Sequence, residues 1–460
     1  MSEWLYYPNR SGNPKKPKTA LIGWSLQAIE AIDKLNKPFI VVAPTEFQSF
    51  AKKYNIPFID WDFGNDHEPG NDEVSEHFLK ESNFKSTLWF DQTKSNLNAG
   101  ETNKHSKIEA VNGKAEELYK ILRAHNVNLA IALFEDTVEW AGALNARFMQ
   151  DPTIFDKSLL FRNKARMKRK AQMAGLQVGV FEEVYNKDDV RRFLKRINEI
   201  SFKDNEKMSP IHIKPFDKAG TVGHRVIYSE KDIETKLNNI SFPCLAESHL
   251  NGKEISVETF IHHGEIKFMN ISDYVVFEHS IMVPPTTYVE EKRPLIRTAM
   301  KRLIDAFGIK YGITHAEFFL SPDGDIKFGE VATRIPGGHI FDLIQRAYGF
   351  NPFQGNILCC NPDTKKEELI KFFPDETKSN GHACCIMAYP SVSYINDLDI
   401  PEDLEDHPYF EKHNFYIPAK REVVKTEGNG NHFGTAFFYG NDSKKMMQPI
   451  MKYVNHSFYI

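Results

Sequence analysis

Residues 315–338 read HAEFFLSPDGDIKFGEVATRIPGG, and this stretch decides the fold. Apolar residues alternate around Glu317, a turn is indicated at 322–324, and the alternation resumes before Glu330. The pattern predicts a β-hairpin in which each strand carries one acidic residue. Antiparallel strands lie about 5 Å apart, so the two carboxylates could share Mg²⁺ with the phosphate oxygens of a nucleotide. An exposed hairpin with scattered charges is the alternative interpretation.

The composition is that of an ordinary globular protein. At 460 residues the chain is too long for one hydrophobic core, and about three domains are expected. The net charge of -4 gives no reason to expect a nucleic-acid partner. No apolar run approaches the length of a membrane span, and the first residues lack the features of a signal peptide. None of the five cysteines has CxxC spacing, which argues against a zinc site or disulfides and favours a cytoplasmic location.

The first 150 residues show the pattern of an open parallel α/β layer. Buried strands are predicted at 19–23, 38–44, 56–60 and 127–134, with helices at 26–35 and 136–148. Residues 61–107 are polar and predict a long flexible insertion. A domain boundary is predicted near 151–152, and further short strands are predicted at 382–389 and 434–439.

A second unit begins with a basic helix at 161–170, which reads FRNKARMKRK. Such a run could form a nucleic-acid patch. The near-neutral chain and the absence of interleaved aromatic residues favour a solvated helix face instead. Lys164 is the exception, because it could contribute to a triphosphate pocket.

A strand at 211–214 ends in Lys214 and precedes the loop Ala219-Gly220-Thr221-Val222-Gly223. Glycines let backbone amides curl around phosphate oxygens, and a lysine on the preceding strand can reach a phosphate. The chain has no GxxxxGK[ST] motif, so this is not a Walker loop. A plain hairpin turn would also need glycine.

Next comes a linker that contains Glu247, His249 and Leu250, followed by Glu254 at the start of an alternating strand. Backbone groups in such a linker can pair with an adenine edge, and Glu254 could accept the ribose hydroxyl protons. A solvated strand edge is the alternative. The sequence His315-Ala-Glu317 resembles the HxE signature of zinc deaminases, but no PCxxC follows, so zinc deamination is rejected.

Taken in order, these motifs resemble the ATP-grasp superfamily over residues 158–351. The resemblance implies an α/β and α+β architecture. Its parts would be an N-terminal parallel α/β (pre-ATP-grasp) domain at 1–150, an ATP-grasp domain of two subdomains at 151–355 and a small C-terminal α+β lid at 356–460. It also implies ATP and Mg²⁺ as cofactors, with Mn²⁺ as an alternative metal.

The same resemblance implies a role for each candidate residue. The phosphates would be held by Lys164, Lys214 and the loop residues Ala219, Gly220, Thr221 and Gly223. Adenine would be contacted by Glu247, His249 and Leu250, the ribose by Glu254, and magnesium by Glu317 and Glu330. Many members carry Asn where this chain has Ala332, which puts a third protein ligand in doubt. The variant from Glu330 to Gly338 is similar to a subgroup of carboxylate–amine ligases that includes L-amino-acid ligases. Arg334, Gly337 and Gly338 would contact the substrate there.

The resemblance implies a ligase that forms an amide bond through an acyl phosphate and releases ADP and phosphate. Arg334 and Lys214 would be its catalytic residues, and its partners would be small carboxylates and amines, such as amino acids, with no nucleic acid and no membrane. Family members are often homodimers. The alternatives are an ATP-grasp carboxylase with a biotin-carboxylase-like arrangement, an acid–thiol ligase, or a non-catalytic nucleotide-binding regulatory protein.

Overall fold

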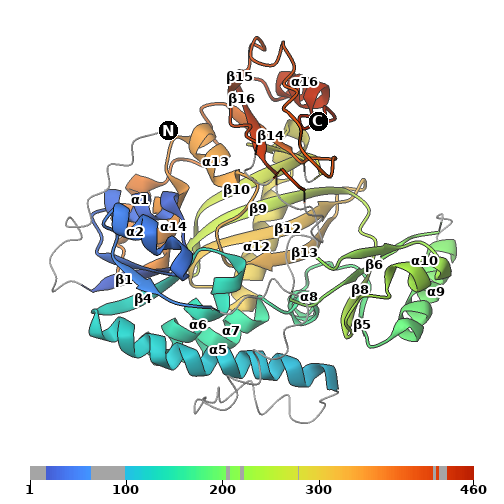
Figure 1. Cartoon of the computed structure of the whole chain (residues 1–460). Helices are drawn as coiled ribbons and strands as arrows, with labels where there is room; N and C mark the ends of the chain where they lie inside the picture. Colours follow the sequence, from blue (N-terminus) through green and yellow to red (C-terminus); the bar gives the residue numbers. More distant parts are fainter. Residues whose placement is uncertain are drawn as a thin grey trace. The chain divides into compact units, whose positions relative to one another are not determined.

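The computed structural model describes residues 17–63, 99–203, 208–217, 222–277, 279–417, 421–423 and 432–460. The chain forms two compact units (Figure 1). The first contains Met1–Phe161, Ala332–Ile335 and Phe353–Thr364, and the second contains Arg162–Val331, Pro336–Pro352 and Lys365–Ile460. Two short segments from late in the sequence therefore return to the first unit. The division into three domains at 150 and 355 stays a prediction.

The first unit is built on a four-stranded parallel sheet, which confirms the predicted α/β layer. In the order of the sheet, its strands are β3 (Phe58–Asp60), β2 (Phe39–Ala43), β1 (Lys18–Ile22) and β4 (Val127–Ala132). Its helices are α1 (Leu26–Lys34), α2 (Gln48–Lys53), α5 (Ala99–Ala124), α6 (Val138–Phe148), α7 (Thr153–Leu160) and α14 (Pro352–Cys360). Hydrophobic clusters lie on both faces of this sheet, so its central strands are almost wholly apolar.

The predicted polar insertion at 61–107 lies largely outside the described residues, which resume at 99. From there α5 runs for 26 residues, a helix that was not predicted. Its sequence has few apolar residues in its first half, so helical periodicity is weak there.

The second unit contains a small antiparallel sheet in the order β5-β8-β6-β7. These strands are β5 (Phe181–Val184), β8 (Cys244–Ser248), β6 (Ile211–Lys214) and β7 (Arg225–Ile227). Helices α9 (Lys187–Lys203) and α10 (Glu230–Lys236) supply apolar residues to its core, and α8 (Lys164–Met173) contacts β5. Because α9 and α10 cover one face of the sheet, polar side chains such as Lys214 point to the other face, on which α8 packs.

The second unit also contains an eight-stranded sheet in the order β13-β12-β9-β10-β11-β14-β16-β15. Its strands are β9 (Lys253–His262), β10 (Glu265–Val276), β11 (Ser280–Val283), β12 (Tyr311–Leu320), β13 (Ile326–Ala332), β14 (His382–Ala388), β15 (Phe410–His413) and β16 (Gly434–Gly440). The remaining helices are α11 (Thr287–Glu290), α12 (Arg293–Phe307), α13 (Ile340–Tyr348), α15 (Lys366–Phe372) and α16 (Ser443–Tyr453).

The predicted acidic hairpin is confirmed, since β12 and β13 are neighbours in this sheet. In its turn, the Ser321 amide donates to the Asp325 carbonyl at 2.9 Å, and Gly324 adopts φ +86. That backbone conformation favours glycine. The predicted C-terminal strands at 382–389 and 434–439 are also confirmed, and they extend the same sheet rather than forming one of their own.

One face of the large sheet is polar across its centre. The register places His315 beside Glu258 and Glu258 beside Asn270, and in the next row Glu317 beside Ser256. Side chains of residues paired in this way point to the same face. Apolar residues alternate with them in β9, as an antiparallel strand with two different faces requires.

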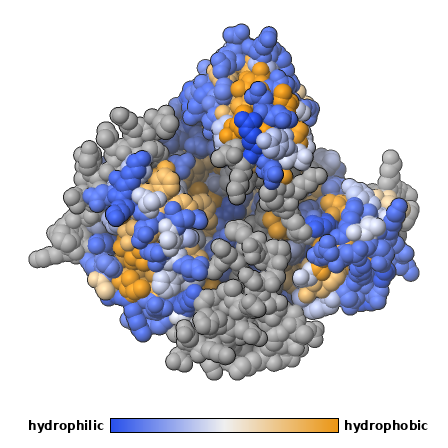
Figure 2. Space-filling model, viewed as in Figure 1, coloured by the Kyte–Doolittle hydropathy of each residue, from blue (hydrophilic) through white to orange (hydrophobic). Residues whose placement is uncertain are grey.

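The surface seen in Figure 2 is mostly hydrophilic, with separate hydrophobic patches, one of them on the C-terminal segment that Figure 1 draws in red. Among the described residues, no helix combines the length and apolar character needed to cross a membrane.

Candidate active site

The carboxylates of Glu317 and Glu330 form the centre of the candidate site. Burial and the nearby Glu330 raise the pKa of Glu317. Burial also opposes ionisation of Glu330, but Lys164 and Lys214 outweigh it and lower its pKa to about 2. The Lys164 ammonium lies 2.7 Å from a Glu330 carboxylate oxygen. Two partly exposed carboxylates that disfavour each other's charge fit a divalent cation, which would relieve that repulsion.

Magnesium is commonly held by one or two carboxylates, with water and phosphate oxygens filling its remaining positions. The donor set of Glu317 and Glu330 fits this pattern. Within the described ranges, no group of three or more His, Cys, Asp and Glu side chains is arranged to hold a metal ion.

Lys168 is buried, so the prediction of a solvated helix face, from which only Lys164 was excepted, is wrong for Lys168. Its ammonium lies 2.5 Å from a Glu247 carboxylate oxygen and donates to the Gly329 carbonyl at 2.7 Å. The side chains of Lys168 and Glu247 are each 3% exposed. Lys164 and Lys168 are one helical turn apart, so the same face of α8 carries both lysines into the site.

Glu247 lies in β8, and its carboxylate forms ion pairs with two lysines. Its carboxylate pairs with Lys168 and also lies 3.5 Å from the Lys214 ammonium. It therefore acts as the buried counter-charge of two lysines. Burial opposes the charge of Lys214, but Glu247 and Glu330 outweigh it and raise the pKa of this lysine.

We expect Lys168→Met to destabilise the second unit by about 3 kcal/mol, because it leaves Glu247 buried without its closest partner. The value is at the low end for a broken buried pair, since Lys214 still faces the carboxylate. Calorimetric unfolding measures the effect. Lys170→Met on the same helix is the control and should change stability by no more than about 0.5 kcal/mol. Equal effects of the two substitutions would contradict the assignment.

The predicted phosphate loop is only partly described. Ala219, Gly220 and Thr221 lie outside the described residues. Gly223 adopts φ +70, and a Cβ atom there would lie 2.6 Å from Cγ of Pro215. Both the backbone conformation and the space therefore require glycine at this position.

His249 belongs to a row of three histidines, of which only His249 was predicted as a site residue. His224 Nε2 lies 2.8 Å from His212 Nδ1, and His212 Nε2 lies 2.9 Å from His249 Nδ1. The rings are close to parallel, at 25° and 17°. Burial and Lys214 lower the pKa of His212 to about 3 and that of His224 to about 4, so both are neutral at pH 7. His212 precedes Lys214 by two residues in β6, which places both side chains on one face.

The structure places Leu250 and Glu254 in different surroundings. Leu250 is buried, and a Cβ atom at Gly179 would lie 2.8 Å from its side chain. Glu254 lies in β9 opposite Phe319, on the polar face of the large sheet.

The buried carboxylate of Glu258 was missed in the sequence. It accepts from Ser256 Oγ and His315 at 2.8 Å each, and from Asn270 Nδ2 and Ser272 Oγ at 2.7 Å each. Burial opposes its ionisation, but His315 and the other donors outweigh burial and lower the pKa of Glu258. The available signal was the recurrence of polar residues at 254, 256 and 258 in a strand with buried apolar neighbours.

Arg334 belongs to the first unit, where its Nε donates to a Glu135 carboxylate oxygen at 2.6 Å. Its Nη1 donates to the Ile335 carbonyl at 2.9 Å. Gly337 and Gly338 belong to the second unit. A Cβ atom at Gly337 would have no neighbour within 4 Å, whereas one at Gly338 would lie 2.7 Å from Ile281. Gly337 therefore leaves open space, and Gly338 allows close packing on β11.

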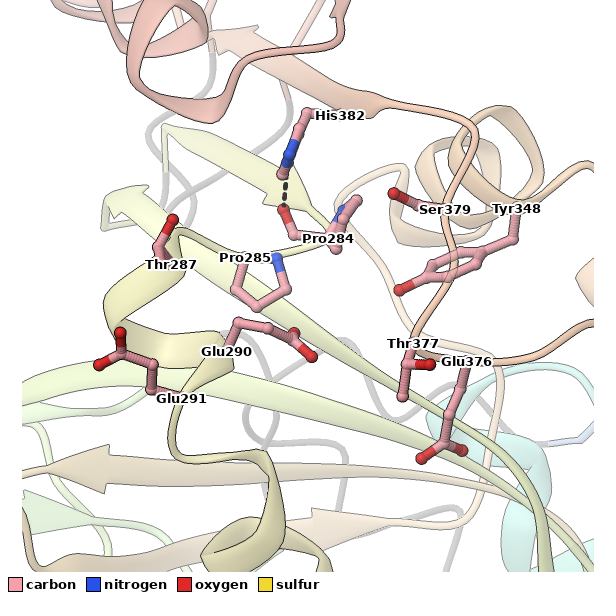
Figure 3. Close-up of a pocket in the computed structure, with 10 residues that line it drawn as sticks. All are labelled: Pro284, Pro285, Thr287, Glu290, Glu291, Tyr348, Glu376, Thr377, Ser379 and His382. Carbon is pink, nitrogen blue, oxygen red and sulfur yellow. Dashed lines mark hydrogen bonds between the residues drawn. The ribbon is translucent and has the colours of Figure 1, made fainter.

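A separate cavity of about 360 Å³ lies beside α11, and none of the predicted site residues lines it (Figure 3). Two of its acidic residues have partners in the arginines of α12: Glu290 accepts from Arg293 at 2.9 Å, and Glu376 pairs with Arg297. His382 donates to the Pro284 carbonyl at 3.2 Å across the same cavity. These contacts involve three of the polar residues that line the cavity.

Comparison with known proteins identifies a domain family, a relative and several structural neighbours. Residues 207–342 match the family model of the ATP-grasp domain. An L-arginine-specific L-amino acid ligase of Bacillus subtilis is 25% identical over 257 residues, which cover 52% of this chain and 59% of the relative. The match thus spans less than two thirds of that relative's length.

Among solved structures, the L-amino acid ligase from Bacillus licheniformis has a TM-score of 0.63 at 15% identity, covering 95% of this chain and 96% of that chain. N5-carboxyaminoimidazole ribonucleotide synthetase from Thermotoga maritima has a TM-score of 0.60 at 15% identity, with 95% and 97% covered. The biotin carboxylase domain of the Hydrogenobacter thermophilus 2-oxoglutarate carboxylase, solved with MgADP and bicarbonate, has a TM-score of 0.60 at 12% identity, with 96% and 90% covered.

Residues 207–342 match the ATP-grasp domain, and the chain shares its fold with the L-amino acid ligase from Bacillus licheniformis over nearly its whole length. This confirms the predicted superfamily and fold class. The structural neighbours include both an amino acid ligase and a carboxylase, so the fold is shared by proteins with different reactions.

Proposed function

We propose that this protein is an ATP-dependent carboxylate–amine ligase that joins two amino acids and releases ADP and phosphate. The observation that carries the proposal is the pair Glu317 and Glu330 with Lys164 and Lys214 beside it. Carboxylates for a cation and lysines for phosphates are the groups that phosphoryl transfer needs in one place. The amino acid ligase from Bacillus subtilis among its relatives supports amino acids as substrates.

In this proposal Glu317 and Glu330 hold Mg²⁺, or Mn²⁺ as an alternative, and Lys164 and Lys214 hold the triphosphate. Bound Mg-ATP supplies the phosphoryl group that activates the substrate carboxylate as an acyl phosphate. The neutral histidine row beside Lys214 offers a flat surface for the base, and Glu254 offers acceptors for the ribose hydroxyls. The predicted contact of the loop from Ala219 to Gly223 with the phosphates falls largely on residues outside the described ranges.

Arg334 orients the substrate carboxylate, since a guanidinium fork matches a carboxylate in two bonds. Its hydrogen bonds to Glu135 and to the Ile335 carbonyl fix the plane of the fork. Gly337 leaves room for the substrate. A homodimer and a cytoplasmic location remain predictions.

A carboxylase is the second candidate, favoured by the biotin carboxylase domain among the structural neighbours. Because one fold can serve several reactions, it also accommodates an acid–thiol ligase or a non-catalytic nucleotide-binding protein.

The test is ADP release with all pairs of the twenty L-amino acids in the presence of Mg-ATP. We expect at least one pair to give one ADP and one phosphate for each dipeptide, which mass spectrometry identifies. ADP release that depends on bicarbonate or a thiol, and not on a second amino acid, would favour a carboxylase or an acid–thiol ligase. Nucleotide binding with no turnover under any condition would favour the binding protein.

A further inference from the structure

Three neighbouring side chains form a path from the interior of the large sheet to the candidate metal site. Glu258 is 0% exposed, His315 is 10% exposed and Glu317 is 28% exposed. They lie on β9 and β12, adjacent strands that are third and second from the β13 edge of the sheet (Figure 1). The exposed fraction of the side chains increases from Glu258 to Glu317. The network therefore reaches the surface at the candidate metal site.

The hydrogen bond from Nδ1 of His315 to Glu258 fixes the orientation of the His315 ring. A carboxylate offers about four acceptor positions, and Ser256, Asn270, Ser272 and His315 occupy them. A carboxylate only accepts, so Nδ1 of His315 carries the hydrogen that it donates. The other ring nitrogen, Nε2, is the one nearer to Glu317. It lies 3.9 Å from a Glu317 carboxylate oxygen, which is too far for a direct hydrogen bond.

The opposite face of the same two strands shows that the fold alone does not require this network. Thr259 pairs with Thr314 there, and both are fully buried without an ionisable group. A buried carboxylate is destabilising unless its partners compensate, and apolar residues would serve a core equally well. Glu258 is therefore placed on the face that the site uses.

We propose that His315 is an outer-sphere ligand of the metal, with Glu258 as its positioning residue: Nε2 accepts a hydrogen bond from a water bound to the cation that Glu317 holds. The inference rests on the proposed role of Glu317. Mg²⁺ keeps several of its waters in proteins, and each such water needs an acceptor. Partners of this kind typically contribute about 10- to 100-fold to metal affinity.

The experiment measures binding of Mn²⁺ to the full chain in the presence of ADP, from the loss of the electron paramagnetic resonance signal of free Mn²⁺. We expect His315→Phe to weaken Mn²⁺ binding by about 10- to 100-fold. We expect Glu258→Gln to do the same, because a glutamine amide can donate to Nδ1 and leave the hydrogen on Nε2. His315→Gln, which offers an amide oxygen as acceptor, should recover part of the affinity.

Two comparisons separate this role from a merely structural one. Binding of ADP in the presence of EDTA should be the same in the wild type and the variants. Thr314→Val, on the opposite face of the same strand, should leave Mn²⁺ binding unchanged. If Glu258→Gln does not fold, Ser272→Ala, which removes one donor to Glu258, should weaken Mn²⁺ binding by a smaller factor.

Unchanged Mn²⁺ binding in His315→Phe would overturn the inference, and so would an equal loss of metal-free ADP binding. A wild type that binds Mn²⁺ with ADP but joins no amino acids would refute only the proposed ligase. A wild type that binds no Mn²⁺ with ADP would overturn both.

Discussion

Glu330→Gln should lower the rate of ADP release by at least about 100-fold, the largest effect that we expect from one substitution at the site. Glutamine keeps the size of the side chain but removes the charge that faces the cation. It also removes the carboxylate that Lys164 contacts at 2.7 Å. Because the pKa of Glu330 is about 2, the wild-type side chain is fully ionised at neutral pH, and the substitution removes a whole charge.

The matched control is Asp323→Asn, which makes the same change of charge in the exposed turn of the same hairpin. It should leave ADP release within about twofold of the wild type, as surface substitutions usually do. Thermal unfolding checks that both variants are folded. ADP release near the wild-type rate in folded Glu330→Gln would refute the assignment of this residue to the metal.

Arg334→Lys should lower turnover by about 30- to 1000-fold while changing ATP affinity little. Lysine keeps the charge but loses the planar fork. One charge-assisted pair in a transition state is worth about 2–4 kcal/mol, which corresponds to this range. Glu135→Gln should have a smaller effect, because it weakens the contact that orients Arg334 and leaves the fork intact. An equal loss in ATP affinity and in turnover would contradict a role in transition-state binding.

Transfer of an oxygen label from the substrate to phosphate tests the proposed acyl phosphate. With ¹⁸O in the substrate carboxylate, one label should appear in the released phosphate, because the carboxylate oxygen that attacks the γ-phosphate leaves with it. Label in AMP, with pyrophosphate as the other product, would mean adenylation and would overturn the acyl-phosphate mechanism.

The local features of the fold could be predicted from the sequence because they depend on neighbouring residues. The alternation around Glu317 and Glu330 and the turn at Gly324 determine the β12–β13 hairpin. The apolar runs of β1, β2 and β4 are typical of strands buried on both faces of a parallel sheet. The order of these motifs along the chain was sufficient to indicate the superfamily.

The tertiary structure alone decided which charged groups meet. Lys168 lies in a run of basic residues that is typical of a solvated helix face. Its burial depends on Glu247, which is 79 positions away in the sequence and belongs to strand β8. The row of three histidines depends in the same way on tertiary structure. His212 lies in β6, His224 directly precedes β7 and His249 directly follows β8, and sheet pairing brings them together.

Glu258 shows the limit of sequence patterns most clearly. Its place in β9 follows from alternation, but its ionised state depends on donors from β10 and β12, which sheet pairing brings together. Local propensity and periodicity are properties of adjacent residues, so they determine strands, turns and faces. The energy of a buried charge depends on its partners in space, and only the folded chain brings those partners within hydrogen-bonding distance.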